Sequence, residues 1–239
     1  MLPVSGPMVE CVDVAYVYPD GTQALDGVSF RIAQGESVAI VGANGAGKST
    51  LIHHLNGHLT ATRGHVRIGD LTVTRDTLAA IRRAVGLVFQ DADDQLFMPT
   101  VAEDVAFGPV NQGLSPAEVE ARVNAALGRV GISGLRDKPP YRLSGGEKKR
   151  AAIAGVLAMA PDVLVMDEPT GGLDPQGRRQ LIELFADFGH TRIFTTHDLD
   201  MVLELCPRTI VLAQGRVRAD GPTRSVFSEP PQLAVARAV

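Results

Sequence analysis

One stretch of this sequence constrains the fold more than any other: an apolar run, residues 38–41, leads directly into a glycine-rich loop that ends in Lys48 and Ser49. The loop residues are Gly42, Ala43, Asn44, Gly45, Ala46, Gly47, Lys48 and Ser49, and Thr50 follows them. Glycines at this spacing let successive backbone N–H groups face inward, and the helix expected from Lys48 directs its positive dipole end to the same point. The alternative is a glycine-rich turn that binds nothing, but the full spacing after a strand-like run favours a phosphate-binding loop.

Lys48 and Ser49 are the loop residues whose side chains carry chemistry. The ammonium of Lys48 suits the β- and γ-phosphates of a nucleotide, because it is a compact positive charge. The hydroxyl of Ser49 is a suitable ligand for the Mg²⁺ that accompanies those phosphates. The sequence therefore predicts a nucleoside triphosphate and Mg²⁺ as ligands.

Length, charge and cysteine content limit the class of protein. The chain has 239 residues, which suits one large α/β domain or one domain with an inserted subdomain. Its net charge is -4, from 23 basic and 27 acidic residues, so no basic field favours nucleic acid as a partner. Cys11 and Cys206 lie far apart in the sequence, which fits a reducing cytoplasm better than a disulfide scaffold or a zinc site. Since no apolar run approaches the roughly 20 residues of a spanning helix and residues 1–8 lack secretory-signal features, we expect a soluble or membrane-peripheral chain.

Short alternating strands lie on both sides of the glycine-rich loop. Residues 9–17 and 25–32 are predicted to pair as an antiparallel hairpin, because Pro19-Asp20-Gly21 between them is a strong turn signal. Residues 64–68 are a further predicted strand. Tyr18, just before the turn, is either a packing aromatic or a flat face on which adenine stacks, and its position alone favours packing.

Four later apolar runs are typical of buried strands, and three of them end in polar residues. The runs are residues 85–89, followed by Gln90; 163–166, followed by Asp167 and Glu168; 193–196, followed by His197; and 210–212, which we expect to close the series. Helical stretches between them, such as residues 178–188, indicate parallel crossover units and an α/β fold. Ligands bind beyond the carboxyl ends of strands in such sheets, so we expect these polar residues to converge on the Lys48 loop.

Residues 100–160 have a helical pattern. A capping box of Ser115 and Glu118 starts one predicted helix, and a second is predicted over residues 148–159, with Pro161 ending it. We therefore predict a single domain, residues 1–239. Residues 1–99 and 161–228 would form its core, residues 100–160 an inserted helical subdomain and residues 229–239 a loose tail.

The polar residues at the strand ends fit the chemistry of phosphoryl transfer. Successive strand residues point to opposite sides, so Asp167 can hold Mg²⁺ through a water while Glu168 faces the attacking water. A carboxylate aimed at a water beside the γ-phosphate predicts hydrolysis. Gln90 is a candidate ligand of Mg²⁺ or of that water. His197 is either a structural histidine or a residue that hydrogen-bonds the γ-phosphate and registers its presence.

Two further segments have two interpretations each. Ser144, Gly145 and Gly146 form a second helix start that suits an anion, and it is either an ordinary helix cap or the part that completes the nucleotide site of another subunit. The acidic residues 91–94 with Leu96 and Phe97 are either a solvated loop or a surface that binds a helix of a membrane partner.

On these motifs the sequence resembles the ATP-binding cassette (ABC) family of ATPases over nearly its whole length. Residues 143–147 resemble the family signature, with Glu147 in place of the usual glutamine. By resemblance, residues 42–49 are the phosphate loop and Tyr18 stacks on adenine. Gln90 is then similar to the lid-loop glutamine, Asp167 to the metal-binding aspartate, Glu168 to the catalytic glutamate, His197 to the switch histidine and Asp174 to the aspartate of the inter-subunit loop.

The resemblance implies an α/β fold of the P-loop nucleoside triphosphate hydrolase class. Its core sheet would be mostly parallel, with an N-terminal antiparallel β-subdomain and an inserted helical subdomain. ATP and Mg²⁺ would be its cofactors. It also implies two cassettes arranged head to tail, with a homodimer compatible with this chain. Each ATP would lie between the Lys48 loop of one subunit and residues Ser144, Gly145, Gly146 and Glu147 of the other.

Within the family, residues 94–97 and 138–146 look most like the ATPases of energy-coupling-factor (ECF) transporters, particularly those for cobalt or nickel. This resemblance implies a peripheral ATPase on the cytoplasmic face of the cell membrane, with a transmembrane coupling subunit and a substrate-binding membrane subunit as partners. A vitamin such as biotin is the alternative cargo. A soluble cassette of DNA repair or translation would carry a long coiled-coil insertion or a second cassette, and a small-molecule kinase would lack residues 143–147.

Overall fold

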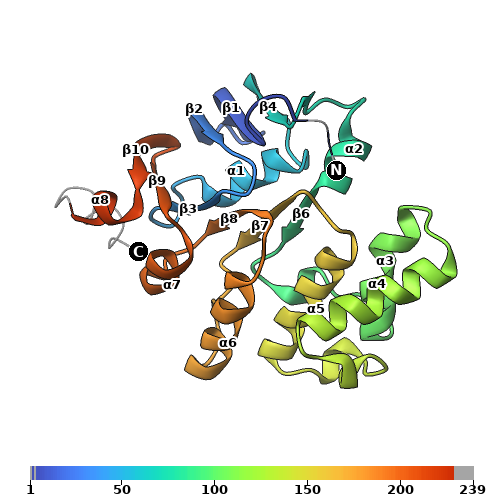
Figure 1. Cartoon of the computed structure of the whole chain (residues 1–239). Helices are drawn as coiled ribbons and strands as arrows, with labels where there is room; N and C mark the ends of the chain where they lie inside the picture. The colour runs from blue at the N-terminus through green and yellow to red at the C-terminus, as the bar shows by residue number, and fades with distance from the viewer. Residues whose placement is uncertain (1, 3, 229–239) are drawn as a thin grey trace.

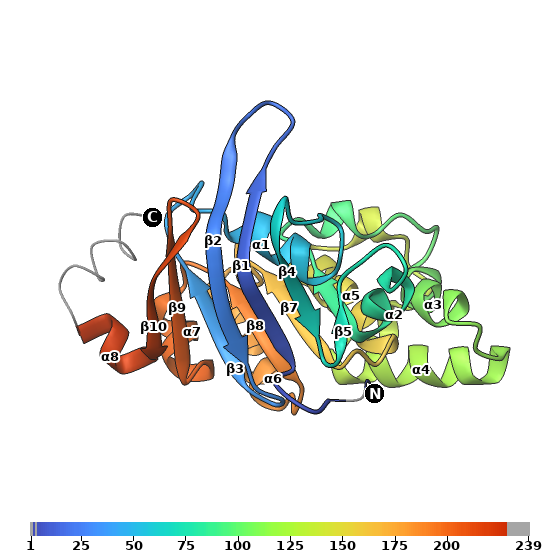
Figure 2. The same ribbon diagram turned by 90° about the horizontal axis from the view of Figure 1, so that it is seen from above.

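The computed structural model describes residue 2 and residues 4–228, which fold into stacked layers (Figure 1). The predicted tail, residues 229–239, lies outside the described residues. A six-stranded sheet forms the middle of the molecule. A four-stranded sheet covers one of its faces, with helix α1 (Lys48–Leu55) between the two sheets, and the view from above shows the same stacking (Figure 2).

The six-stranded sheet has the strand order β10-β9-β3-β8-β7-β6. Its strands are β3 (Ser37–Val41), β6 (Val85–Val88), β7 (Val163–Asp167), β8 (Thr191–Thr195), β9 (Arg208–Ala213) and β10 (Arg216–Pro222). All neighbouring pairs are parallel except β9 and β10, which confirms the mostly parallel core. The expectation that residues 210–212 close the series is wrong, because β10 follows them. None of its residues is fully buried, so it lacks the apolar run that marks the other strands.

The four-stranded sheet is antiparallel and has the order β2-β1-β4-β5. Its strands are β1 (Val9–Val17), β2 (Gln23–Ile32), β4 (Arg63–Ile68) and β5 (Leu71–Thr72). The predicted hairpin of β1 and β2 is confirmed, with the Gly21 N–H donating to the carbonyl of Tyr18 at 2.9 Å. Gly21 has a φ of 87°, a backbone conformation that glycine adopts without steric cost.

The central strands are buried on both faces, which explains why they read as continuous apolar runs. In β7, Val163 and Val165 face a cluster that also contains α1 and the four-stranded sheet. Leu164 and Met166 face the opposite cluster, which the helices on the other side of the sheet complete. The sheet is therefore held rigidly between two cores, and its carboxyl edge is a fixed support for side chains.

The helices are mostly short and well capped. After α1 come α2 (Leu78–Ala84), α3 (Val101–Asn111), α4 (Pro116–Arg129), α5 (Gly145–Ala158), α6 (Pro175–Ala186), α7 (Leu199–Leu205) and α8 (Thr223–Ser228), with short 3-10 turns at Ala92–Asp94, Ser133–Leu135 and Pro140–Arg142. Helix α5 begins earlier than residue 148. Ser144 caps it: the Glu147 N–H donates to Ser144 Oγ at 3.3 Å, and the Ser144 N–H donates to Glu147 Oε2 at 2.7 Å. This reciprocal box offsets the poor helix propensity of the two glycines that start the helix.

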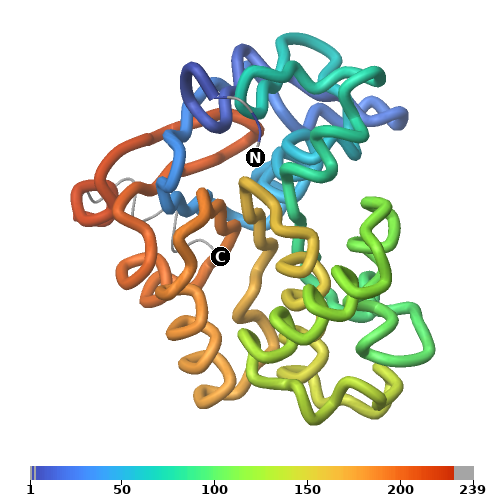
Figure 3. The backbone as a smooth tube through the Cα atoms, turned by 45° about the vertical axis from the view of Figure 1, so that its right-hand side comes forward, coloured from blue at the N-terminus to red at the C-terminus, as the bar shows by residue number. Residues whose placement is uncertain are grey.

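Helices α3, α4 and α5 pack against one another beside β6 (Figure 3). Ser115 caps α4 with a second capping box, as predicted from its spacing to Glu118. Among the described residues, no helix has the length and apolar character needed to cross a membrane.

Candidate nucleotide-binding site

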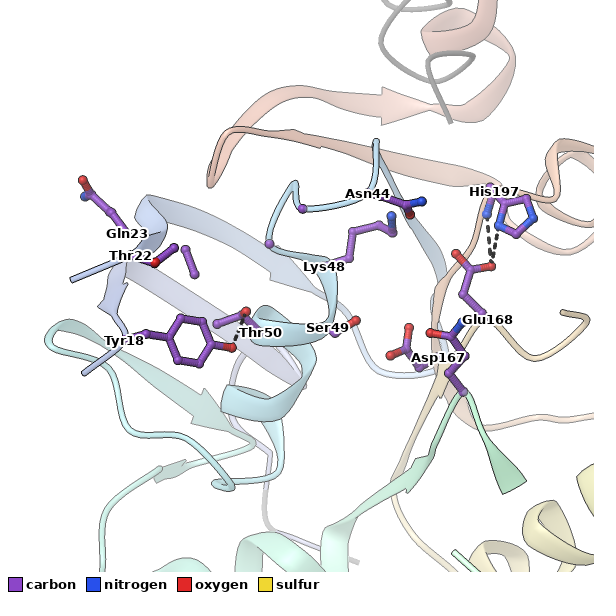
Figure 4. A pocket seen from close by; sticks show the side chains of 14 residues that line it. Tyr18, Thr22, Gln23, Asn44, Lys48, Ser49, Thr50, Asp167, Glu168 and His197 are labelled. Carbon is purple, nitrogen blue, oxygen red and sulfur yellow. Dashed lines mark hydrogen bonds and ion pairs between the residues drawn. The ribbon is translucent and has the colours of Figure 1, made fainter. Parts of the chain in front are cut away.

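A cavity of about 580 Å³ opens where the strands β3, β6, β7 and β8 end (Figure 4). Its lining residues are Tyr18, Thr22, Gln23, Ala24, Asn44, Gly45, Gly47, Lys48, Ser49, Thr50, Gln90, Asp167, Glu168 and His197. The glycine-rich loop and the four polar residues of the strand ends therefore share one cavity, in the arrangement expected from the sequence. Thr22, Gln23 and Ala24 also line the cavity but were not predicted as site residues. Their position in the hairpin just after Tyr18 could have indicated them.

The glycine-rich loop follows β3 and ends where α1 begins, at Lys48. Lys48 is only 7% exposed, and its Nζ donates to the carbonyls of Gly42 at 2.6 Å and of Ala43 at 3.3 Å. A Cβ on Gly42 would lie 2.1 Å from the carbonyl oxygen of Leu212, so glycine is required there by the close approach of β9. The loop is thus held in a closed curve around its lysine.

Tyr18 stands at one end of the cavity and is fixed from two sides (Figure 4). Its hydroxyl lies 2.9 Å from Thr50 Oγ1, and the ring of Tyr16 packs edge-on against its ring at a centroid distance of 5.0 Å. A fixed aromatic ring at the edge of a cavity can serve as a stacking surface for a flat base.

The two neighbouring carboxylates leave β7 in different directions. Asp167 is the last residue of the strand, and Thr195 Oγ1 donates a hydrogen bond to its Oδ1. Glu168 does not continue the strand, because its φ is 44°, which is uncommon for a residue with a side chain. The sequence predicted that strand alternation separates these two carboxylates, but a left-handed turn at Glu168 separates them instead. The turn is held by two hydrogen bonds: the Glu168 N–H donates to the carbonyl of Thr195, and the Gly171 N–H donates to the carbonyl of Glu168.

Glu168 and His197 contact each other directly (Figure 4). Oε2 of Glu168 lies 2.9 Å from His197 Nδ1 and accepts the His197 N–H at 3.3 Å. Glu168 is 8% exposed, whereas the His197 side chain is 56% exposed. A nearly buried carboxylate is thus oriented by a histidine that reaches solvent.

The second predicted helix start does not share this cavity. Ser144, Gly145, Gly146 and Glu147 line a separate depression of about 390 Å³ together with Asp174. The carboxylate of Glu147 is engaged by the Ser144 N–H and hydroxyl, and these hydrogen bonds lower the pKa of Glu147. Asp174 caps α6, because its Oδ1 accepts the N–H of Gly177 at 2.7 Å. Within one chain, therefore, the structure keeps these residues apart from the Lys48 loop.

The fold and the loop at Lys48 define a class, the P-loop nucleoside triphosphatases. The family model described as ABC transporter matches residues 25–171, which is well over half of the chain. The chain therefore belongs to the ABC transporter family and is an ATP-hydrolysing enzyme.

Two relatives and two solved structures are similar to the chain over most of its length. A putative ABC transporter ATP-binding protein of Geobacter sulfurreducens is 65% identical, covering 98% of this chain and 94% of that protein. The energy-coupling factor transporter ATP-binding protein EcfA of Methanocaldococcus jannaschii is 49% identical, covering 93% of this chain and 81% of that protein.

Both structures confirm the predicted fold class. The structure of cbiO1 from Clostridium perfringens, described as part of the ABC transporter complex cbiONQ, matches with a TM-score of 0.84 and 43% identity, covering 93% of this chain and 91% of that chain. The ATP-binding cassette MJ0796, a dimer in a post-hydrolysis state bound to ADP and Pi, matches with a TM-score of 0.82 and 29% identity, covering 91% of this chain and 99% of that chain.

Proposed function

We propose that this chain is the ATP-hydrolysing subunit of an ECF-type importer that takes up cobalt or nickel ions. The observation that carries the proposal is the similarity to two transporter ATPases, EcfA at 49% identity and cbiO1 at 43% identity, over more than nine-tenths of the chain. A vitamin such as biotin is the alternative cargo, and an ABC ATPase without a transport role is the alternative function.

In the proposed site, ATP occupies the cavity of the Lys48 loop. The adenine stacks on Tyr18. The phosphates are surrounded by the backbone of residues 42–49 and by Thr50, which follows the loop. Lys48 exchanges its carbonyl partners for phosphate oxygens. The distribution of groups along the cavity supports this orientation, because the aromatic ring lies at one end and the carboxylates lie at the other (Figure 4).

The residues at the carboxylate end fit Mg²⁺, since the ion prefers oxygen ligands. Ser49 offers a hydroxyl, Gln90 an amide oxygen and Asp167 a carboxylate, and all three line the same cavity. Bound there with ATP, Mg²⁺ supplies positive charge to the β- and γ-phosphates. Thr195 holds the Asp167 carboxylate in place by donating to its Oδ1.

Glu168 is the proposed general base for the attacking water, and His197 keeps it oriented. The contact of His197 Nδ1 with Glu168 Oε2 supports this pairing. Because the carboxylate is nearly buried, few waters compete for it, and the one it orients can be aligned with the γ-phosphate.

We propose that a second copy of the chain completes the site. Its Ser144, Gly145, Gly146 and Glu147 would cover the γ-phosphate, and its Asp174 loop would lie at the subunit contact. The exposed start of α5 and the dimeric state of the similar cassette MJ0796 support this arrangement. The hydrogen bonds of Glu147 indicate that it contributes by fixing Ser144, since its carboxylate already accepts the Ser144 N–H.

A groove of about 400 Å³ that residues 95–97 help to line is the proposed contact for a helix of the transmembrane coupling subunit. Phe97 is 63% exposed and Phe107 is 47% exposed, and their rings pack edge to face at the rim. Asp104 fixes this rim, because its Oδ1 accepts the N–H groups of Phe97 and Met98 at 3.0 Å. The acidic stretch 91–94 directly precedes the groove residue Gln95 in the sequence, and its carboxylates would suit a basic partner helix. Such a partner would hold the chain on the cytoplasmic face of the cell membrane, beside a substrate-binding membrane subunit. The proposed assembly includes no nucleic acid.

The proposed division of labour follows the fold. Residues 1–99 and 161–228 would carry the nucleotide, and residues 100–160 would carry both the signature and much of the partner groove. Movement of the second unit against the first would then transmit ATP binding to the membrane subunits.

Uptake measurements test this function. Cells that lack the chain should take up radiolabelled cobalt or nickel only when the wild-type chain is restored, and Lys48→Ala should not restore uptake. Tagged chain purified from membranes should bring a small transmembrane protein and a metal-binding membrane protein with it. Restored biotin uptake would contradict the metal cargo, and purification without any membrane protein would contradict the transport role.

A further inference from the structure

Lys149 is a buried cation that joins two parts of the molecule. It lies in α5, one residue after Lys148, and only 4% of it is exposed. Its Nζ donates to the backbone carbonyl of Gln90 at 2.5 Å. Helix α5, which Ser144 caps, is therefore bonded directly to Gln90, two residues beyond the end of β6.

Burial lowers the pKa of Lys149, and the negative charges of Asp91, Asp167 and Glu168 act in the opposite direction. Two of these carboxylates, Asp167 and Glu168, line the nucleotide cavity. A buried ion is costly to desolvate, and a buried ion pair replaced as a whole by apolar residues is often no less stable, although removal of one partner alone destabilises. Stability alone therefore does not account for a lysine at this position.

Neighbouring contacts fasten the same segment to α5. Lys148 Nζ lies 2.6 Å from Asp93 Oδ1, and Gln95 Nε2 donates to the carbonyl of Ala152 at 3.0 Å. The Lys148 pair contributes little to stability, because ion pairs near the surface are weakened by water and by salt. Of these three contacts to α5, the hydrogen bond of Lys149 is the one made to Gln90, which lines the nucleotide cavity.

We propose that Lys149 is a positioning residue for ATP hydrolysis, which ties Gln90 to helix α5 so that the Gln90 amide moves together with the helix start at Ser144. The proposal rests on the proposed role of Gln90 at the metal site. The bond to Lys149 fixes the backbone at Gln90, from which the side-chain amide reaches the cavity.

Four single variants test the proposal. Lys149→Met keeps the side-chain volume and removes the charge and the donors, whereas Lys149→Arg keeps both. Lys148→Met is the matched control, because it removes the same charge from the same turn without touching Gln90. Gln90→Ala removes the amide that Lys149 is proposed to orient.

We expect Lys149→Met to lower kcat by about 10-fold to 100-fold, the range for a slightly misplaced catalytic group, with the affinity for ATP changed less than about twofold. Its melting temperature should fall, because the carbonyl of Gln90 loses its donor, and hydrogen exchange of residues 88–95 should become faster. Lys149→Arg should recover most of the activity, and Lys148→Met should keep kcat within about twofold. An unchanged kcat in Lys149→Met, or an equal loss in Lys148→Met, would overturn the proposal.

A double-mutant cycle separates this proposal from the function it rests on. If Lys149 acts through Gln90, the variant with both Lys149→Met and Gln90→Ala should be no slower than Gln90→Ala alone. Losses that multiply would overturn the role of Lys149 and leave that of Gln90 intact. A Gln90→Ala variant with unchanged kcat and Mg²⁺ dependence would instead contradict the role of Gln90, and the Lys149 proposal would fall with it.

Discussion

Replacing Glu168 by glutamine tests the proposed chemistry most directly, because the change is nearly isosteric. Glu168 Oε2 contacts two groups of His197, the ring nitrogen Nδ1 and the backbone N–H. The amide oxygen of glutamine can still accept the backbone N–H, so the turn after β7 should persist. What disappears is the ability to take a proton from water.

The expected loss of rate follows from that single change. A positioned general base contributes about 10²-fold to 10⁴-fold, and each factor of ten corresponds to about 1.36 kcal/mol of activation free energy. Glu168→Gln should therefore raise the barrier by about 3 to 5 kcal/mol. Since the nearly buried carboxylate also bears negative charge close to the phosphates, the affinity for ATP should stay the same or increase.

The assay is the release of phosphate at saturating Mg²⁺ and ATP, combined with calorimetric titration of ATP. Glu168→Gln should bind ATP and release phosphate at 1% of the wild-type rate or less, as the lower estimate of about 10²-fold requires. Turnover within about threefold of wild type would refute the assignment of Glu168 as the base. A simultaneous loss of ATP binding would show that the substitution disturbs the cavity, and His197→Ala would then separate orientation of the carboxylate from its chemistry.

Four further outcomes are expected. Lys48→Ala should abolish ATP binding in calorimetry, and unchanged affinity would count against the loop as the phosphate site. Ser144→Phe should block ATP-induced dimerisation in light scattering while costing the folded monomer about 1 kcal/mol through the lost helix cap, and an unaltered dimer would argue against a site shared between subunits. Asp94→Lys should reduce uptake in cells but spare basal hydrolysis, and normal uptake would exclude this residue from the partner surface. Gly86→Ala should lower the free energy of unfolding by about 1 to 3 kcal/mol in denaturant titration, because its Cβ would lie 2.3 Å from Val156 Cγ1; unchanged stability would mean that α5 shifts freely against β6.

The buried strands could be predicted because each is apolar on both faces. The run at residues 163–166 differs from β7 (Val163–Asp167) by one residue, since the change from Met166 to Asp167 marks the end of the strand in the sequence as well as in the structure. Strand β10 (Arg216–Pro222) lacks such a contrast, because its partly exposed residues alternate with exposed ones at the edge of the sheet. Its pairing with β9 is a tertiary effect that composition does not reveal.

The site residues could be predicted as a group, because parallel strands end at the same edge. Their orientation could not. The φ of Glu168 and its contact with His197 depend on a turn that only the folded chain defines. Lys149 was missed for a similar reason: in the sequence it is one lysine in a charged stretch, and its bond to Gln90 joins residues 59 positions apart.

The closed loop around Lys48 has a consequence for product release. Because the Lys48 ammonium is already satisfied by the carbonyls of Gly42 and Ala43, an arriving phosphate replaces existing partners rather than filling an unmet need. Attraction to the triphosphate is therefore offset in part by the bonds it breaks. After cleavage of the γ-phosphate the same carbonyls would compete for the lysine, and a loop that can satisfy its own lysine would favour release of the product.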